Sequence, residues 1–177
     1  LCVENSHNMC GGRLLNPAAL HALSAPARQR GLPVHMDGAR LFNAAVGLGT
    51  PARDLTADVD SVMFCLSKGL SAPVGSMLAG SRDFINEARR GRKLLGGGMR
   101  QAGILAAAGL LALTEMVDRL AEDHANARHL AQGLAELQGV SVAPETVESN
   151  ILFFDVIGAD DQPDNDAFTR SAAAAGA

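Results

Sequence analysis

Short apolar segments alternate with helical segments over the first 80 residues, and this alternation constrains the fold more than any other feature. Chains that alternate in this way form βα units around a mainly parallel sheet. We therefore predict an α/β domain. Strands are expected at 1–5, 33–36, 57–67 and 74–80, and helices at 17–30, 38–47 and 81–95.

The second half of the chain predicts one long helix from 101 to 137, followed by strands at 140–144 and 149–156. Late strands after a long helix suggest a smaller α+β domain, so we expect a division into 1–120 and 121–177. Pro26 argues against the second half of the first helix, because proline removes a backbone donor. His124 and His129 stand among charged residues, and we expect both to face solvent.

Composition excludes several classes of protein. Aromatic residues make up 3% of the chain and the net charge is −4, which argues against a nucleic-acid partner. The longest uncharged apolar run, 102–113, is too short to span a bilayer. Three cysteines without a CxxC pair predict buried thiols in a reducing compartment rather than a disulfide or a zinc site. We expect a cytoplasmic protein with no membrane partner and no metal.

The sequence is expected to begin within a strand and to end within a helix. Leu1 is not a methionine, no signal peptide is recognisable, and the alanine-rich end resembles a helix cut in mid-course. We therefore expect the chain to be a fragment of a longer protein.

Two candidate strands deliver an acid and an amine to the same edge of the predicted sheet. Asp37 ends one strand, and Lys68, 31 residues later, follows the next. Ligands bind at the carboxyl ends of parallel strands. A carboxylate near an amine suits pyridoxal phosphate, whose ring nitrogen needs an acid and whose aldehyde needs a lysine. Ala39 is small enough for a ring to lie against it, and the hydroxyl of Ser67 suits a phosphate.

The same residues also have structural interpretations. Asp37 is an equally good N-cap for the following helix, and Arg40 is a candidate ion-pair partner on the same face. A structural ion pair between Lys68 and Asp37 explains the spacing as well. The spacing alone leaves these alternatives open.

Five segments, in unbroken order, resemble the L-threonine aldolase family. They are ENSHNMCGGR, HMDGARLFNAAVGLG, CLSKGLSAPVGSMLAGSRDFI, RKLLGGGMRQAGILAAAGLLAL and RLAEDHANA, and the resemblance runs from Leu1 to about Asp155. Any one motif is weak evidence, whereas the ordered set is specific. The resemblance implies an aspartate-aminotransferase-like fold (fold type I of the pyridoxal phosphate enzymes), present here as part of the large domain and part of a small C-terminal domain.

The resemblance also implies roles for single residues. Lys68 is the lysine expected to form the aldimine with pyridoxal phosphate, and Asp37 is expected to hold the ring nitrogen. Arg40 is expected to bind the substrate carboxylate, with His7 close to it. The remaining implied cofactor contacts are Ala39 on the ring, Ser67 on the phosphate, and Arg100 near the phosphate in a site shared between subunits.

The implied reaction is the retro-aldol cleavage of L-threonine or L-allo-threonine to glycine and acetaldehyde, by a homo-oligomer (a dimer or a tetramer). Two alternatives to this function stay open. In the first, the chain is a catalytically incomplete fragment of such an enzyme. In the second, it is another fold type I enzyme, such as a serine hydroxymethyltransferase-like enzyme or a β-eliminating lyase.

Overall fold

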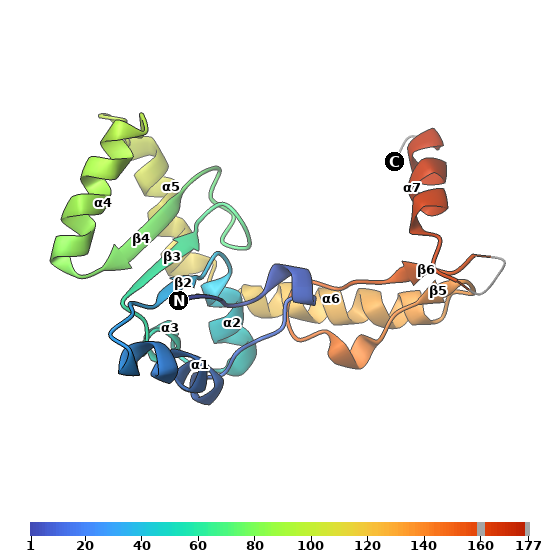
Figure 1. The fold of residues 1–177 in the computed structure, drawn as a ribbon. Coiled ribbons are helices and arrows are strands. Elements are labelled where there is room, and N and C mark those ends of the chain that lie inside the picture. The colour runs from blue at the N-terminus through green and yellow to red at the C-terminus, as the bar shows by residue number, and fades with distance from the viewer. Residues whose placement is uncertain (159–161, 176–177) are drawn as a thin grey trace.

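A four-stranded sheet forms the centre of the computed structural model, which describes residues 1–158 and 162–175. The strands lie in the order β1 (Cys2–Glu4), β2 (His35–Asp37), β3 (Ser61–Cys65) and β4 (Ser76–Gly80). The first three are parallel, and β4 runs antiparallel at the edge of the sheet (Figure 1). The predicted α/β architecture with a mainly parallel sheet is therefore confirmed.

Three helices pack against the parallel strands. They are α1 (Pro17–Gln29), α2 (Leu41–Leu48) and α3 (Ala52–Leu55), and they lie on the same side of the sheet in Figure 1. A short 3₁₀ turn, η1 (Asn8–Cys10), precedes them. Their apolar side chains and those of the strands form the main core, which contains Val3, Leu20, Ala27, Val34, Met36, Leu41, Ala44, Ala45, Leu55 and Val62. This burial provides most of the free energy that holds the sheet to its helices.

The first helix begins as predicted but does not end at its proline. Asn16 is the N-cap, and its Oδ1 accepts a hydrogen bond from the backbone N–H of Ala19 at 2.9 Å. The helix continues through Pro26 to Gln29. The expectation that Pro26 interrupts it is wrong, because the face formed by Leu20, Ser24 and Ala27 is buried and offsets the lost hydrogen bond.

The single long helix predicted from 101 to 137 is wrong as well. The structure has two helices, α5 (Gly103–Glu115) and α6 (Leu120–Ala135), with a break between them. At the break, Met116 and Val117 pack against a second core cluster that includes Leu120, which is only 1% exposed. The chain turns so that Leu120 is buried and Met116 and Val117 are half-buried, and no glycine or proline marks that turn in the sequence.

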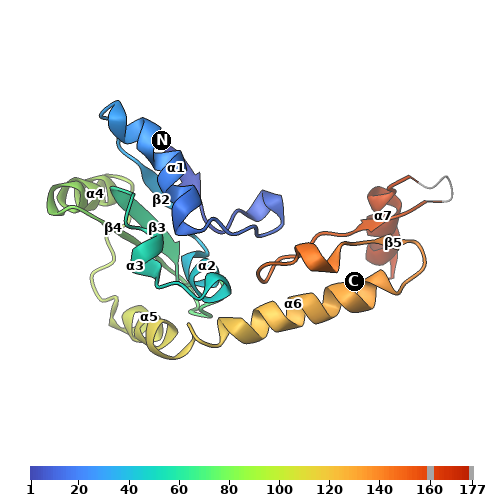
Figure 2. The ribbon, with the colours of Figure 1, turned by 90° about the horizontal axis from the view of Figure 1, so that it is seen from below.

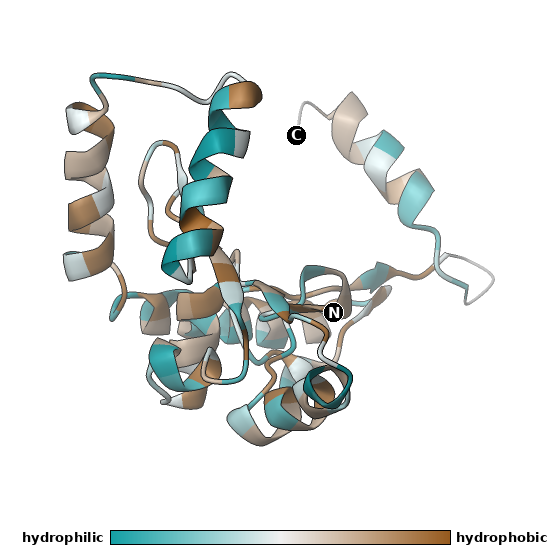
Figure 3. Ribbon diagram, turned by 60° about the vertical axis from the view of Figure 1, so that its left-hand side comes forward, coloured by the Kyte–Doolittle hydropathy of each residue, from teal (hydrophilic) through white to brown (hydrophobic). Residues whose placement is uncertain are grey.

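Helix α4 (Arg82–Leu94) lies against the edge strand β4, and residues 95–102 connect it to α5, which stands apart from it (Figure 2). The apolar residues of this α4–α5 segment are largely exposed: Leu95 is 90% accessible and Ile104 is 88% accessible. Figure 3 shows hydrophobic residues at the end of α4 and along α5. The described residues, 1–158 and 162–175, therefore leave much of the apolar surface of the α4–α5 segment exposed.

The C-terminal part extends from the sheet along α6 (Figure 2). It contains β5 (Val140–Ser141), η2 (Pro144–Thr146), β6 (Asp155–Val156) and α7 (Asn165–Ala174), and β5 pairs antiparallel with β6. Glu148 links this part to the N-terminal loop, because its carboxylate accepts hydrogen bonds from Arg13 and from the backbone N–H of Leu14. The domain boundary expected at residue 120 stays a prediction.

The cysteines and the helix lengths test two predictions from composition. All three cysteines are free, but Cys2 and Cys10 are exposed and Cys65 is half-buried, so the prediction that the thiols are buried is wrong. Cys2 lies on the opposite side of β1 from the buried Val3, and Cys10 lies in an exposed turn. Among the described residues, no helix is long and apolar enough to cross a membrane.

Candidate active site

Asp37 is the last residue of β2 and lies at the edge of the sheet where the parallel strands end. Its backbone is level with Glu4 of β1 and Met63 of β3. Its carboxylate Oδ1 accepts a hydrogen bond from the backbone N–H of Ala39 at 3.0 Å. The N-cap of α2 is Arg40 rather than Asp37, so the helix-cap interpretation of Asp37 is wrong. The carboxylate remains exposed at the edge.

The turn after Asp37 is tied to the neighbouring strand. The N–H of Gly38 donates to the carbonyl of Met63 at 2.9 Å, and the N–H of Cys65 donates to the carbonyl of Ala39 at 3.4 Å. A Cβ on Gly38 would lie 2.8 Å from the Met63 oxygen, so a larger residue does not fit without movement. The acid is therefore held by a turn in close contact with β3.

Lys68 lies in the turn that follows β3. Leu66, Leu70 and Ala72 are buried in the second core cluster, whereas Ser67 and Lys68 are exposed. Two backbone bonds close the turn: Ala72 N–H donates to the Leu66 carbonyl at 3.0 Å, and Ser71 N–H donates to the Lys68 carbonyl at 2.9 Å. The buried leucines anchor the turn and leave the amine in the open. No ion pair joins Lys68 to Asp37 in the described part of the chain.

The segment after β1, residues 5–7, follows the end of that strand at the same edge of the sheet as Asp37. The N–H of Asn5 donates to the carbonyl of Asp37 at 3.0 Å, and the Asn5 amide makes two hydrogen bonds to the backbone of Leu15. Nε2 of His7 lies 3.4 Å from Oε2 of Glu4. The hydroxyl of Ser6 and Nδ1 of His7 are buried and have no hydrogen-bond partner within residues 1–158 and 162–175. These two unpartnered polar atoms belong to the residues that directly follow Asn5, and each is free to bond a ligand that reaches it.

The two predicted arginines lie in different places. Arg40 is half-buried at the start of α2, three residues after Asp37, and so belongs to the same edge. Arg100 is exposed in the segment that joins α4 to α5, at the far end of α4 (Figure 1). The fold thus gathers His7, Asp37, Ala39, Arg40, Ser67 and Lys68 at one edge and leaves Arg100 apart from them.

A buried histidine was missed by the sequence analysis. His124 is 2% exposed, so the expectation that it faces solvent is wrong. Its Nε2 lies 3.3 Å from Nδ2 of Asn43, which is also buried. Burial lowers the pKa of His124, the charge of Arg128 lowers it further, and Asp123 acts in the opposite sense. A signal was present: Leu120, His124, Ala127 and Ala131 recur at helical spacing on one face.

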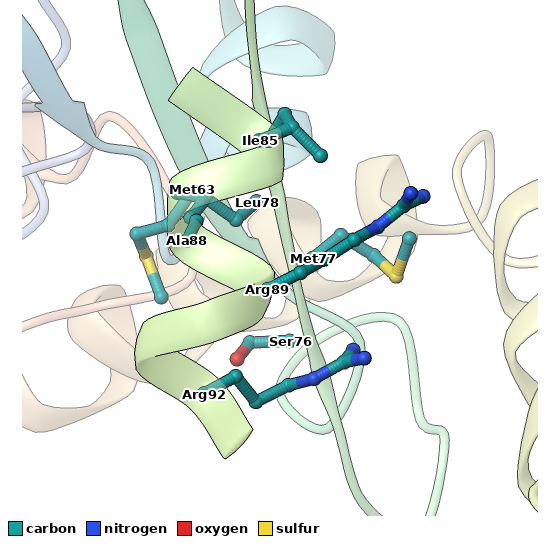
Figure 4. A pocket seen from close by; sticks show the side chains of 8 residues that line it. All are labelled: Met63, Ser76, Met77, Leu78, Ile85, Ala88, Arg89 and Arg92. Carbon is teal, nitrogen blue, oxygen red and sulfur yellow. The ribbon is translucent and has the colours of Figure 1, made fainter. Parts of the chain in front are cut away.

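A separate hollow lies between β4 and α4. It has a volume of about 470 Å³ and an apolar floor that includes Met63, Met77 and Ile85. Figure 4 shows Arg89 and Arg92 extending from α4 along this hollow. None of the predicted site residues lines it.

The residues at the strand ends suit pyridoxal phosphate. The edge offers an exposed carboxylate on Asp37 and an exposed amine on Lys68. The residues after Asp37, Gly38 and Ala39, have small side chains or none. The buried polar atoms of Ser6 and His7 have no partner among the described residues. An acid, an amine and small residues match what the ring nitrogen, the aldehyde and the flat ring need.

Comparison with known proteins places these features in a family. The family described as Beta-eliminating lyase matches residues 1–157. The chain is 47% identical over 156 residues to low-specificity L-threonine aldolase 1 of Arabidopsis thaliana, and 48% identical over 153 residues to the low specificity L-threonine aldolase of Escherichia coli strain K12. These alignments cover 88% and 86% of this chain and 44% of each relative, so the chain spans less than half the length of either.

Solved structures agree with the sequence relatives. A candidate L-allo-threonine aldolase from Listeria monocytogenes superposes with a TM-score of 0.82 at 26% identity, covering 90% of this chain and 45% of that one. A PLP-dependent aminotransferase from Streptococcus suis shares the fold, with a TM-score of 0.72 at 20% identity, over 96% of this chain and 45% of that one. The prediction of a partial aminotransferase-like fold is confirmed. The chain belongs to the beta-eliminating lyase family and is homologous to its low-specificity L-threonine aldolases.

Proposed function

We propose that the protein cleaves L-threonine or L-allo-threonine into glycine and acetaldehyde with pyridoxal phosphate as cofactor. The observation that carries this proposal is the common edge at which Asp37 ends β2 and Lys68 follows β3. Relatives from Arabidopsis thaliana and Escherichia coli are named as low-specificity L-threonine aldolases, which supports this substrate class. Because the chain spans 44% of either relative, the proposal concerns the site residues that this chain carries.

Pyridoxal phosphate, when bound, supplies an aldehyde that links to amines and an electron-poor ring that accepts electrons from a breaking Cα–Cβ bond. We assign the amine of Lys68 to the aldehyde and the carboxylate of Asp37 to the ring nitrogen, where a negative charge favours the protonated form. Ala39 lies in the turn after Asp37 and offers a small surface to the ring. Ser67, beside Lys68, offers a hydroxyl to the phosphate, and Arg100 is assigned to the phosphate of a second copy.

Arg40 and His7 are assigned to the substrate. A guanidinium binds a carboxylate through paired, charge-assisted hydrogen bonds. Arg40 begins α2 close to Asp37, so a carboxylate held there lies near the site of the ring. Fixing that carboxylate fixes which Cα bond faces the ring, and this orientation selects bond cleavage at Cβ.

The number of lysines makes the assignment testable. The chain has two lysines, Lys68 and Lys93, and both are exposed. The purified chain is incubated with pyridoxal phosphate, reduced with borohydride and digested, and the adduct on each lysine is measured by mass spectrometry. We expect the adduct on Lys68, its loss in Lys68→Ala, and its retention in the matched control Lys93→Ala. An adduct on Lys93 rather than Lys68 in the unmodified chain, kept in Lys68→Ala and lost in Lys93→Ala, sinks the proposal.

A second measurement separates the proposed reaction from its alternatives. The same chain is mixed with pyridoxal phosphate and L-threonine, L-allo-threonine or L-serine, and glycine, acetaldehyde and pyruvate are quantified. Glycine and acetaldehyde support the aldolase, and pyruvate from serine supports a β-eliminating lyase. In a parallel sample that also contains tetrahydrofolate, glycine from serine with transfer of the hydroxymethyl carbon to the tetrahydrofolate supports a serine hydroxymethyltransferase-like enzyme. Labelling of Lys68 without any product supports the catalytically incomplete fragment.

We also propose that the protein forms a homo-oligomer. The α4–α5 segment exposes apolar side chains, among them Met99 at 67% and Ile104 at 88%, and Figure 3 shows hydrophobic residues along it. Arg100 lies in the same exposed segment, which supports a site shared between copies. Sedimentation of the chain, compared with Ile104→Glu, tests this: the substitution should shift the protein toward the monomer, and an unchanged monomer in both samples contradicts it.

A further inference from the structure

A polar pair is buried against the turn that carries Lys68. Asn43 of α2 is 3% exposed and His124 of α6 is 2% exposed, and their side-chain nitrogens are 3.3 Å apart. Burying a polar group costs free energy unless it is hydrogen-bonded, and replacing both partners of a buried hydrogen bond by apolar groups of the same shape can be neutral or stabilising. Two apolar side chains would pack these helices at lower cost, so the pair calls for a role beyond packing.

The orientation of the Asn43 amide favours one tautomer of His124. Nδ2 of Asn43 faces Nε2 of His124, and an amide nitrogen can only donate, so this orientation requires Nε2 to accept. An imidazole that accepts at Nε2 is neutral and carries its proton on Nδ1. A protonated imidazole would have a donor at both nitrogens and would lose this bond.

The surroundings of His124 favour the neutral form. On its own helix, Arg128 opposes a positive charge and Asp123 favours one, while burial opposes it most. Helix α2 contributes the uncharged Gly47, and a Cβ on Gly47 would lie 3.6 Å from Cε1 of His124 and 3.4 Å from the carbonyl oxygen of Glu148.

The carboxylate of Glu148 is engaged elsewhere, by Arg13 and by the N–H of Leu14. No further ionisable group near His124 is identified from α2 or from this segment in the described residues.

The other side of Asn43 meets the lysine turn. A Cβ on Gly69, the residue after Lys68, would lie 3.3 Å from Oδ1 of Asn43 and 2.7 Å from Cδ2 of Leu120. The backbone of Gly69 therefore rests on the amide of Asn43. The buried Leu66 and Leu70 hold the rest of the turn. We therefore expect the position of the Lys68 backbone to depend on the position of the Asn43 amide.

Asn43 also lies on the helix that begins directly after the acid. Helix α2 starts behind Arg40, three residues after Asp37. A single amide thus contacts the lysine turn, belongs to the helix that follows the acid turn, and is held by a histidine from α6. The pair is placed to fix the separation between the amine and the carboxylate.

We propose that His124 is a positioning residue for Lys68: its neutral imidazole holds the Asn43 amide against Gly69 and so sets the lysine turn relative to Asp37. This inference rests on the proposed function, since it assumes that Lys68 reacts with the aldehyde of pyridoxal phosphate. It adds to that function a buried group that touches neither cofactor nor substrate.

The test compares His124→Leu, which has no acceptor, with His124→Gln, whose carbonyl can accept from Asn43. His129→Leu is the matched control, because His129 is exposed on the same helix. Each full chain is treated with limiting pyridoxal phosphate and borohydride, and the ratio of adduct on Lys68 to adduct on Lys93 is measured. A lost buried hydrogen bond changes an equilibrium by about tenfold. We therefore expect about a tenfold fall in the ratio for His124→Leu and recovery of most of it in His124→Gln.

The outcomes separate this inference from the proposed function. If unmodified protein shows no preference for Lys68, the proposed function fails. If it shows the preference and His124→Leu keeps it while folded, the inference is overturned and the proposed function stands. Nitrogen NMR of the unmodified chain tests the inference without any substitution, should His124→Leu not fold. It should show His124 neutral with the proton on Nδ1 at neutral pH, and a proton on Nε2 overturns the inference.

Discussion

Gly38→Ala should destabilise the protein because the turn after Asp37 has no room for a methyl group. The new Cβ would lie 2.8 Å from the Met63 carbonyl oxygen, 3.1 Å from Cβ of Leu41 and 3.1 Å from Cγ2 of Val62. One of these neighbours is backbone and cannot rotate away. Overpacking of this kind costs ~1–3 kcal/mol. Lengthening the hydrogen bond from Gly38 to Met63, now 2.9 Å, adds ~0.5–1.5 kcal/mol.

Gly133→Ala is the matched control, because it adds the same methyl group inside α6 where no atom lies within 4 Å. Alanine is the better helix former, so this variant should gain ~0.5–1 kcal/mol. Urea unfolding followed by circular dichroism gives the free energy of unfolding of each protein. The two variants should move in opposite directions from the parent, with the free energy of unfolding of Gly38→Ala lower by ~1.5–4.5 kcal/mol. A Gly38→Ala protein as stable as the parent would refute the close approach of the acid turn to β3.

Three further predictions concern buried or capping polar groups. Because burial lowers the pKa of His124 below 6.5, the unfolded chain binds more protons than the folded one below that pH. The free energy of unfolding should therefore fall as the pH drops below about 6.5, by at most ~1.4 kcal/mol per pH unit. Urea midpoints measured on both sides of that pH check this, and the same slope in His124→Leu contradicts it. Asn16→Ala removes the hydrogen bond to Ala19 N–H at the start of α1 and should cost ~1 kcal/mol, read from thermal melting. Asn5→Ala leaves the backbone N–H and carbonyl of Leu15 without their side-chain partner and should cost ~2–4 kcal/mol, read from urea unfolding; a loss under ~1 kcal/mol would mean that water replaces the amide.

Local patterns were sufficient to predict the central sheet. The apolar run that ends near Lys68 and the short run that ends at Asp37 became adjacent parallel strands, as their alternation with helices indicates. The antiparallel direction of β4 is not encoded in such a pattern, because it depends on how the turn from Leu66 to Gly75 folds back. The break before Leu120 is also invisible locally, since burial of that leucine rather than a helix breaker produces it.

At the candidate site too, local patterns reveal some residues, whereas long-range packing determines others. Asp37 and Lys68 could be singled out because each follows a strand, and sheet topology brings strand ends together. His124 could not be separated from the exposed His129 by its charged neighbours, because charged residues flank both histidines on α6. The burial of His124 depends on Asn43 of helix α2, 81 residues earlier in the sequence, and a contact of that range leaves only the helical spacing as a local signal.

The glycines after Asp37 and Lys68 are explained by space rather than by backbone conformation. Neither Gly38 nor Gly69 has a left-handed φ, so an alanine could adopt either backbone. Each is excluded instead by what lies against it: a carbonyl oxygen of β3 for Gly38, and the side chains of Leu120 and Asn43 for Gly69. Both groups of the candidate site are thus followed by a point where the chain is pressed onto packed structure. If Asp37 and Lys68 hold the cofactor as proposed, such packing after each residue would limit the movement of the carboxylate relative to the amine.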